Sequence, residues 1–196
     1  MNTLLDSTFV VPEIVASHFH LKDGDTVADF GAGSGYFLKS LSGRVGVTGR
    51  VYACEIQKPL VEKVSQQVQL LALTNVYPLW CDLEEPSGIK IQAGALDAAI
   101  LVNTLFQIED KLAAIKEMGR TLRSGGNLFV IDWTDSSGGL GPTKDHVFSA
   151  LEATALCEAN NFILERHYPA GSHHYGLAFR KIWKCDHLNL PLWLLF

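Results

Sequence analysis

Three glycines preceded by an acid are the residues of this chain whose spacing points most clearly to chemistry. They lie in the run Asp29-Phe30-Gly31-Ala32-Gly33-Ser34-Gly35, a G-x-G-x-G pattern with Asp29 two residues before its first glycine. Glycine tolerates positive φ angles and lets a ligand approach the backbone, and the helix expected after the turn offers free amides to polar or anionic groups. The turn predicts a small-molecule site, although the same glycines would also suit a turn that binds nothing.

A nicotinamide dinucleotide is one ligand that such a turn binds in other proteins. Enzymes that use it carry G-x-G-x-x-G at this place, where the third glycine lets the helix pack tightly on the strand. Tyr36 occupies that third position here. The pattern counts against a nicotinamide-dependent oxidoreductase, which remains an alternative interpretation.

Four polar side chains stand at or just beyond the ends of short apolar runs, and they form a second group: Glu55, Asp82, Asn103 and Asp132. In an open α/β sheet, ligands bind beyond the carboxyl ends of the parallel strands. We therefore expect these side chains to gather at one edge of the sheet. A strand-ending acid or amide that only satisfies local backbone groups is the alternative at each position.

Three histidines could remove a proton from a reacting hydroxyl, phenol or carbon acid, because the histidine pKa suits that task near neutral pH. His146 lies in a glycine- and proline-rich stretch, Trp133 to Phe148, that we expect to cover the site as a loop. His173 and His174 are neighbours near the carboxyl terminus, and we expect one to face the site and one to face solvent. Asp132 could orient a histidine or act itself. A solvated loop residue is the alternative for each histidine.

The elements that position these residues alternate along the chain. Five apolar runs are expected to be strands buried on both faces: Thr26–Phe30, Val51–Glu55, Val76–Cys81, Leu96–Val102 and Asn127–Asp132. Helices are expected over Pro12–His20, over Leu60–Leu73, after an Asp110 cap, and over Ala150–Asn160 behind a Ser149/Glu152 capping box. This order predicts a parallel sheet with helices on both faces.

The carboxyl-terminal part breaks that order. Phe162–Tyr168 and Tyr175–Trp183 are extended runs joined by a short turn, which predicts a hairpin. The predicted fold class is therefore α/β, a Rossmann-like doubly wound mixed sheet of seven strands with an antiparallel C-terminal hairpin. Residues 1–184 are expected to form one domain. The apolar tail, residues 185–196, contains Pro191 and leaves core packing, a homodimer contact or a membrane-surface contact open.

Composition excludes several classes of protein. The chain has 196 residues, of which 47% are hydrophobic and 19% charged, so it is neither disordered nor too small for a core. A net charge of −5 and a pI near 5.8 give no basic face, so nucleic acid is not an expected partner. No signal peptide or membrane-spanning run is visible, which predicts a cytoplasmic protein without membrane insertion. Four widely spaced cysteines are expected to be reduced thiols, and no metal site is expected.

With the acid and the G-x-G-x-G turn in place, the chain resembles the class I S-adenosylmethionine-dependent methyltransferases. The resemblance extends from about Asp25 to Asp132. It implies that Glu55 holds the ribose hydroxyls, that Asp82 accepts from the adenine amino group, and that Asn103 faces the methionine ammonium. The run Leu122-Arg123-Ser124-Gly125-Gly126 is similar to the family's L-K-P-G-G turn before the fifth strand.

The cofactor-binding set implied in this way consists of the glycine turn, the three polar side chains and two apolar neighbours: Asp29, Gly31, Ala32, Gly33, Gly35, Glu55, Ile56, Asp82, Leu83 and Asn103. In Asp132-Trp133, Gly141-Pro142, Asp145-His146, the capped helix and the run from His174 to Lys181, the chain is similar to small bacterial relatives of the quinone-biosynthesis and arsenite methyltransferases. It departs from them at Phe106, where several have a histidine, and it lacks obvious arsenic-binding cysteines.

The resemblance implies an enzyme that uses S-adenosylmethionine, releases S-adenosylhomocysteine and methylates a small-molecule acceptor, with His146, His173, His174 and Asp132 as candidate catalytic groups. The aromatic residues that could wall an apolar acceptor pocket are Tyr36, Phe37, Phe106 and Trp133. A non-catalytic S-adenosylmethionine-binding protein of the same fold is the second alternative.

Overall fold

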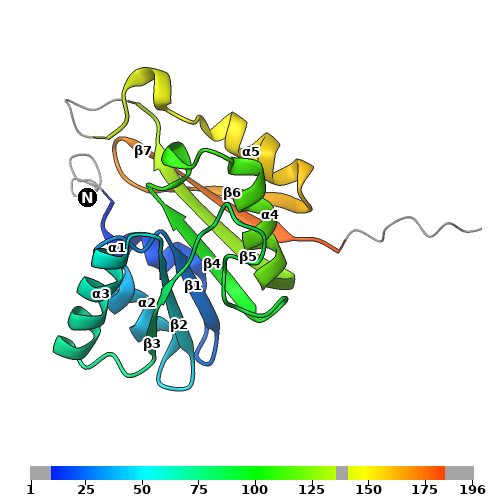
Figure 1. The fold of residues 1–196 in the computed structure, drawn as a ribbon. Helices are drawn as coiled ribbons and strands as arrows, with labels where there is room; N and C mark the ends of the chain where they lie inside the picture. Colours follow the sequence, from blue (N-terminus) through cyan, green and yellow to red (C-terminus); the bar gives the residue numbers. More distant parts are fainter. Residues whose placement is uncertain (1–9, 136–140, 184–196) are drawn as a thin grey trace, which may run out of the picture.

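The computed structural model describes residues 10–135 and 141–183. Seven strands form one mixed sheet in the order β3-β2-β1-β4-β5-β7-β6 (Figure 1). The pairs among β1 to β5 are parallel, whereas β7 runs antiparallel to both β5 and β6. The predicted fold class, with its antiparallel hairpin at the carboxyl-terminal side, is confirmed.

The strands lie close to the predicted ranges. Two of them, β1 (Thr26–Phe30) and β4 (Leu96–Val102), have the predicted ends. The others differ by a residue or more at one end or both: β2 (Arg50–Glu55), β3 (Val76–Trp80), β5 (Leu122–Trp133), β6 (Phe162–Pro169) and β7 (His174–Lys181). Central strands are recognisable because burial on both faces makes them continuously apolar.

Five α-helices and three short 3-10 turns connect the strands within the described residues. The helices are α1 (Pro12–Ala16), α2 (Leu38–Val45), α3 (Lys58–Leu70), α4 (Lys111–Thr121) and α5 (Ala150–Ala159), and the 3-10 turns are η1 (Ser17–Phe19), η2 (Leu105–Gln107) and η3 (Lys144–His146). Asp110 caps α4, and both hydrogen bonds of the Ser149/Glu152 capping box start α5, as predicted.

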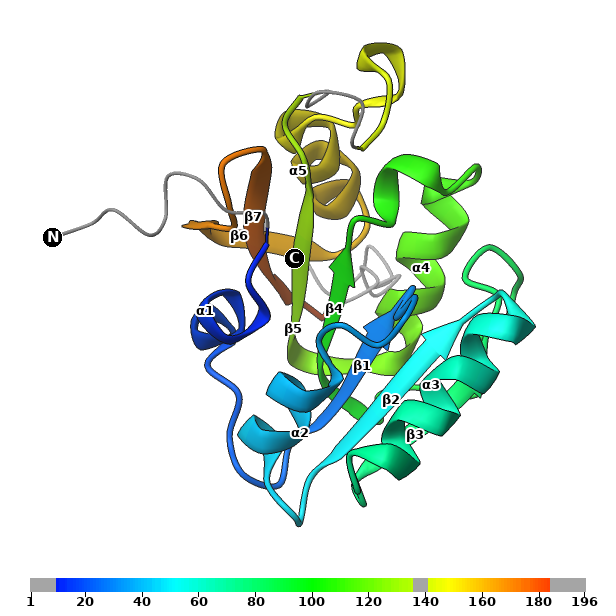
Figure 2. The same cartoon turned by 90° about the vertical axis from the view of Figure 1, so that its left-hand side faces the viewer.

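The core has two parts, one on each face of the sheet. On one face, Val15, Leu41 and Val64 bring α1, α2 and α3 against the strands. On the other face, Ile115 and Cys157 bring α4 and α5 against them. Figure 2 shows α1 and α4 on opposite sides of β5 and β4. Because both faces are covered, ligands can reach the central strands only beyond their ends.

The sequence places the run from Leu122 to Gly126 in a turn before the fifth strand. This prediction is wrong, because β5 already begins at Leu122 and the run lies within the strand. Gly125 has a φ of 73°, and the pairing with β4 shifts register between Leu96 and Ala98. The glycines therefore form an irregularity within a long strand. Gly125 does not end the preceding helix, since Leu122, in extended conformation, caps α4.

One outer edge of the sheet is β3, which contains a proline. Val51 N–H donates to the Asn75 carbonyl over 2.8 Å, and Cys81 N–H donates to the Glu55 carbonyl over 3.1 Å. Backbone groups alternate sides along a strand, so the odd-numbered residues of β3 face β2 and Pro78 faces away from it. The missing N–H of Pro78 therefore lies on the open edge.

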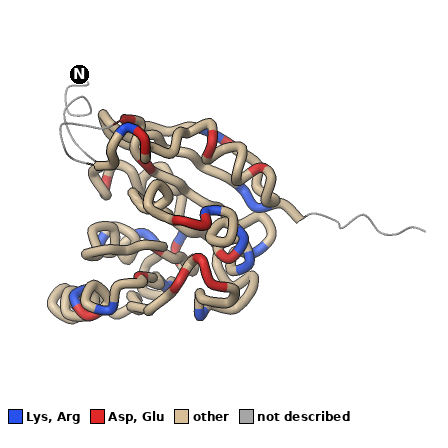
Figure 3. Tube along the Cα trace, turned by 45° about the horizontal axis from the view of Figure 1, so that its top comes forward, with Lys and Arg blue, Asp and Glu red and all other residues tan. Residues whose placement is uncertain are grey.

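Charges of both signs are interspersed along the chain trace in Figure 3. Ion pairs join Arg123 to Asp97 at 2.7 Å and Arg180 to Glu165 at 2.6 Å. Within residues 10–135 and 141–183, no helix is long and apolar enough to cross a membrane. In the same ranges, no three His, Cys, Asp or Glu side chains are grouped as a metal site. The predicted tail, including Cys185 and Pro191, lies outside the described residues.

Candidate functional site

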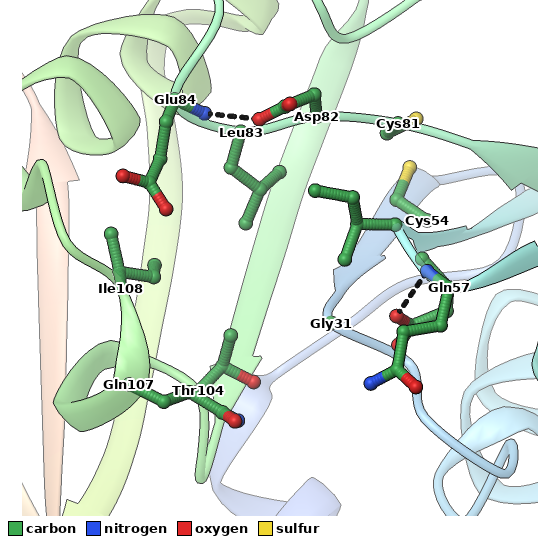
Figure 4. Close-up of a pocket in the computed structure, with 12 residues that line it drawn as sticks. Gly31, Cys54, Gln57, Cys81, Asp82, Leu83, Glu84, Thr104, Gln107 and Ile108 are labelled. Atoms are coloured by element: carbon green, nitrogen blue, oxygen red, sulfur yellow. Dashed lines mark hydrogen bonds between the residues drawn. The ribbon is translucent and has the colours of Figure 1, made fainter.

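A cavity of about 180 Å³ opens at the carboxyl ends of β1, β2, β3 and β4 (Figure 4). Its lining comes from four loops that lie far apart in the sequence: Gly31, Cys54, Glu55, Ile56, Gln57, Cys81, Asp82, Leu83, Glu84, Thr104, Gln107 and Ile108. Five members of the predicted cofactor set are among them, namely Gly31, Glu55, Ile56, Asp82 and Leu83. The parallel sheet brings these residues together because its strands all end at the same edge.

The glycine turn enters the site in a conformation that requires glycine. Gly31, Gly33 and Gly35 have φ angles of 74°, 55° and 84°. A Cβ on Gly31 would lie 2.4 Å from Thr104 Oγ1, so the backbone of β1 comes directly against the loop after β4. A helix follows the turn as expected, and it begins at Leu38.

Glu55 is the carboxylate around which the turn is organised. It is 7% exposed, and its two oxygens accept from Gly33 N–H at 3.0 Å and from Gln57 N–H at 2.9 Å. Two backbone donors hold the carboxylate in one orientation, yet each oxygen keeps a lone pair for a ligand. The group fits a ligand with paired hydroxyls.

Asp29 is a second buried carboxyl beside Glu55, and its pKa is shifted. It is 3% exposed, and burial, followed by the nearby Glu55 charge, raises its pKa to about 7. Asp29 therefore holds its proton to a higher pH than an ordinary aspartate. A cation bound at this edge would favour the ionised form.

Of the two remaining polar side chains of the predicted set, Asp82 lines the cavity and Asn103 is not among its lining residues. An Asp82 carboxylate oxygen accepts from Glu84 N–H at 3.0 Å, which fixes the loop after β3. Asn103 has a left-handed φ of 52°, and its buried Oδ1 has no hydrogen-bond partner. A buried acceptor without a partner calls for an explanation, and a donor supplied by a ligand is one.

The four candidate catalytic residues are not among the residues that line this cavity. His146 is exposed on η3, where its Nδ1 and the Thr143 Oγ1 are 2.6 Å apart. The His173 ring lies 2.9 Å from Asp135 and is partly exposed. His174 is 6% exposed, so the two neighbouring histidines do differ in exposure as their positions suggested.

His174 has an unusual environment. Both ring nitrogens are buried and have no hydrogen-bond partner, and the ring lies 4.3 Å from the Trp133 ring, centroid to centroid. Burial, with a smaller contribution from His173, lowers the pKa of His174 to about 4. The ring is therefore neutral at physiological pH and offers one donor and one acceptor.

Asp132 is fully buried at the end of β5, and its carboxylate oxygens accept from Phe106 N–H at 3.0 Å and Trp133 N–H at 2.8 Å. Burial nevertheless raises its pKa to about 6. These hydrogen bonds tie η2 to β5, so this side chain fixes the loop that carries Thr104 and Gln107 to the cavity.

None of the four aromatic candidates, Tyr36, Phe37, Phe106 and Trp133, is among the residues that line the cavity. Phe37 and Trp133 are 3% and 8% exposed, whereas Tyr36 is 64% exposed. Thr104 and Gln107 line the cavity but carry no sequence motif, so only their place directly after the fourth strand could have suggested them.

Comparison with known proteins gives three findings. Residues 28–130 match the family model described as "Methyltransferase domain". The ubiquinone/menaquinone biosynthesis C-methyltransferase UbiE of Chromobacterium violaceum is 29% identical over 153 residues, which are 75% of this chain and 61% of that protein. The chain thus spans about three fifths of the length of that relative.

Solved structures of methyltransferases also resemble this chain. An S-adenosylmethionine-dependent methyltransferase from Aquifex aeolicus superimposes with a TM-score of 0.82 at 28% identity, covering 89% of this chain and 91% of that one. Geranyl diphosphate C-methyltransferase from Streptomyces coelicolor, solved with Mg²⁺, geranyl diphosphate and S-adenosylhomocysteine, has a TM-score of 0.72 at 16% identity. Its match covers 87% of this chain and 79% of that one, and supports the fold alone.

Proposed function

We propose that this chain, which belongs to the class I S-adenosylmethionine-dependent methyltransferase family, transfers the methyl group of S-adenosylmethionine to a small-molecule acceptor. The observation that carries the proposal is the buried Glu55 carboxylate. The amides of Gly33 and Gln57 hold it in a cavity that Asp82 also lines.

The residues of the cavity fit this cofactor. Glu55 would accept from the ribose hydroxyls, and Asp82 would accept from the adenine amino group between the apolar side chains of Ile56 and Leu83. The unpartnered Asn103 Oδ1 supplies the acceptor that the methionine ammonium needs. Asp29, whose pKa is about 7, would be ionised by that positive charge.

When bound, the cofactor supplies an electrophilic methyl group on a sulfonium whose departure needs no acid. The contribution of the chain is then to position the reactants and to exclude water. The fixed Glu55 carboxylate and the η2 loop held by Asp132 provide a rigid cofactor side. A proton on the acceptor would have to be removed by a nearby group or by solvent.

We assign the acceptor side to the ends of β4 and β5 and the start of β7. Trp133 pairs with His174 across β5 and β7, and the neighbouring β4 ends before Asn103. The neutral His174 ring would orient an acceptor hydroxyl or carbonyl better than it would remove a proton, since its pKa is about 4. Quinone precursors are the first acceptors to screen, because the name of the UbiE relative gives C-methylation in that biosynthesis.

Calorimetric titration with S-adenosylmethionine, S-adenosylhomocysteine and NADH tests the proposal. We expect micromolar binding of the first two ligands, at least tenfold weaker binding in Glu55→Ala, and no binding of NADH. Glu62→Ala, on the exposed side of α3, is the matched control and should bind like the wild type.

Two results would overturn the assignment. Binding of NADH alone would favour the oxidoreductase. Tight binding of S-adenosylmethionine without methyl transfer to any acceptor in a broad screen would favour a non-catalytic binding protein.

A further inference from the structure

Two cysteines lie side by side behind the cofactor cavity. Cys54 is the residue before Glu55 at the end of β2, and Cys81 is the residue before Asp82 just after β3. Because β2 and β3 are neighbouring parallel strands, and Cys81 N–H donates to the Glu55 carbonyl at 3.1 Å, the two positions are held together by the sheet itself. Figure 4 shows the two sulfur atoms next to each other at the cavity wall.

Both thiols are shielded and yet reach the cavity. Cys54 and Cys81 are 0% and 1% exposed, neither is in a disulfide, and both line the cavity. The two thiols interact, because each shifts the pKa of the other, upward for Cys54 and downward for Cys81. A small reagent that enters the cavity would therefore meet a pair of thiols in contact.

The surroundings of the pair favour a thiolate on Cys81. The interaction with the Cys54 thiol lowers the pKa of Cys81, and the backbone N–H and the charge of Lys90 lower it further, whereas burial and Glu117 oppose them. Cys157 is a useful contrast, because burial inside α5 raises its pKa to about 12. Thiolate character controls reaction with oxidants, so Cys81 is the more reactive of the two positions.

We propose that Cys54 and Cys81 form a reversible oxidation site, in which a hydroperoxide that enters the cofactor cavity converts the thiol pair to a disulfide and switches cofactor binding off. This inference rests on the proposed function, since it assigns a regulation to the same site.

The chemistry is a two-electron oxidation with peroxide as the oxidant. The Cys81 thiolate attacks one peroxide oxygen, the O–O bond breaks, and Cys81 becomes a sulfenic acid while the other oxygen leaves as hydroxide and is protonated to water. The Cys54 sulfur then attacks the Cys81 sulfur, the S–S bond forms, and a second water leaves with the Cys54 proton. In sum, two thiols and hydrogen peroxide give one disulfide and two waters.

The disulfide would alter the site because each cysteine precedes a cofactor residue. The register pairs Cys54 with Leu79, so Cys81 lies two residues beyond the partner of Cys54. Cα atoms of such a diagonal pair are about 7 to 8 Å apart, which is more than a disulfide spans, so the ends of β2 and β3 would have to move toward each other. Glu55 is fixed by its hydrogen bonds to the glycine turn, and Asp82 by its own loop. Movement of the strand ends would pull both carboxylates away from their positions.

The test compares the reduced and the peroxide-treated 196-residue chain. Intact mass should fall by two hydrogens, and peptide mapping should find residue 54 linked to residue 81. The affinity for S-adenosylhomocysteine should fall at least tenfold and return with dithiothreitol. Because the cavity is the entry path, saturating S-adenosylhomocysteine should slow the oxidation.

Variants make the result specific. Cys54→Ser and Cys81→Ser should form no disulfide with peroxide and should show no loss of their own affinity that dithiothreitol reverses, whereas Cys157→Ser should respond like the wild type. Added oxygen atoms in place of an S–S bond, or an oxidised protein that binds S-adenosylhomocysteine as tightly as the reduced one, would overturn the proposal. Failure of the reduced wild type to bind it at all would instead count against the proposed function.

Discussion

The surroundings of the buried carboxylates at the edge of the sheet differ in the hydrogen bonds and charges that they supply. Glu55 accepts from two backbone amides, and Asp132 likewise accepts from Phe106 and Trp133. The pKa of Asp29 is raised to about 7 by burial and by the Glu55 charge. A cation bound at this edge would therefore favour release of the Asp29 proton.

Asp29→Asn tests the raised pKa. The pKa of Asp29 is about 7 in the folded state and 3.8 in the unfolded state, so the folded state binds this proton more tightly. The resulting stabilisation is fully present below about pH 4 and is lost as the pH rises through 7. The wild type should therefore lose stability between pH 4 and 8 relative to the variant, by up to about 4 kcal/mol. Urea unfolding at several pH values measures the difference.

The control for this series is Asp145→Asn, which changes an exposed carboxyl on η3. Its stability difference from the wild type should not vary in the same way with pH. If Asp29→Asn and Asp145→Asn followed the same curve, the Asp29 carboxyl would be ionised throughout.

His174→Phe tests the neutral buried histidine, whose pKa is about 4 folded and 6.5 unfolded. Between these values the unfolded chain takes up a proton that the folded chain does not, so the wild type should lose about 2 to 3 kcal/mol as the pH falls from 7 to 4. The phenylalanine variant should lack this contribution and should be at least as stable at pH 7, because it buries no unpartnered nitrogen. His173→Phe, at the exposed neighbour, should keep the loss; equal slopes in the two variants would contradict the assignment.

At the level of helices and strands, the sequence predicted the features that depend only on residues close together in the chain. The ends of β1 and β4 agree with prediction, and the cap of α4 and the capping box of α5 are present. The start of α2 and the extent of β5 were not predictable in this way. Glycine occurs both in turns and in irregular strands, so its presence alone does not distinguish the turn before α2 from the irregularity within β5.

Gly31→Ala tests the contact between the first glycine and the loop after β4. The left-handed φ of 74° and the 2.4 Å approach to Thr104 Oγ1 should together cost at least about 2 kcal/mol of stability and abolish S-adenosylhomocysteine binding. Gly43→Ala lies in α2 with open space around its Cβ position and should stabilise the protein by up to about 1 kcal/mol. Thermal unfolding and calorimetry report both effects.

A second substitution separates the two causes. Adding Thr104→Ala to Gly31→Ala removes the hydroxyl and methyl groups that the new Cβ would meet, so part of the lost stability should return. No recovery would mean that the backbone conformation alone accounts for the loss.

At the scale of the whole molecule, the order of elements predicted the fold and the edge at which the site lies. It placed the glycine turn, Glu55 and Asp82 together, and they are together in the structure. It did not predict the contact between Cys54 and Cys81 or the unpartnered nitrogens of His174. Both depend on which strands are neighbours and how they are offset, and local periodicity carries no information about either.

The proline on the outer edge of β3 has a consequence for the behaviour of the protein in concentrated solution. An open strand is a template on which a second copy can add its own strand, and Tyr77 and Trp80 leave apolar surface there, 42% and 44% exposed. Pro78 removes an N–H from that edge and interrupts the template. Pro78→Val should therefore self-associate at concentrations where the wild type and the loop control Pro86→Val sediment as before, and analytical ultracentrifugation would detect it. A cyclic side chain in one strand thus raises the concentration that this protein tolerates before its copies begin to polymerise.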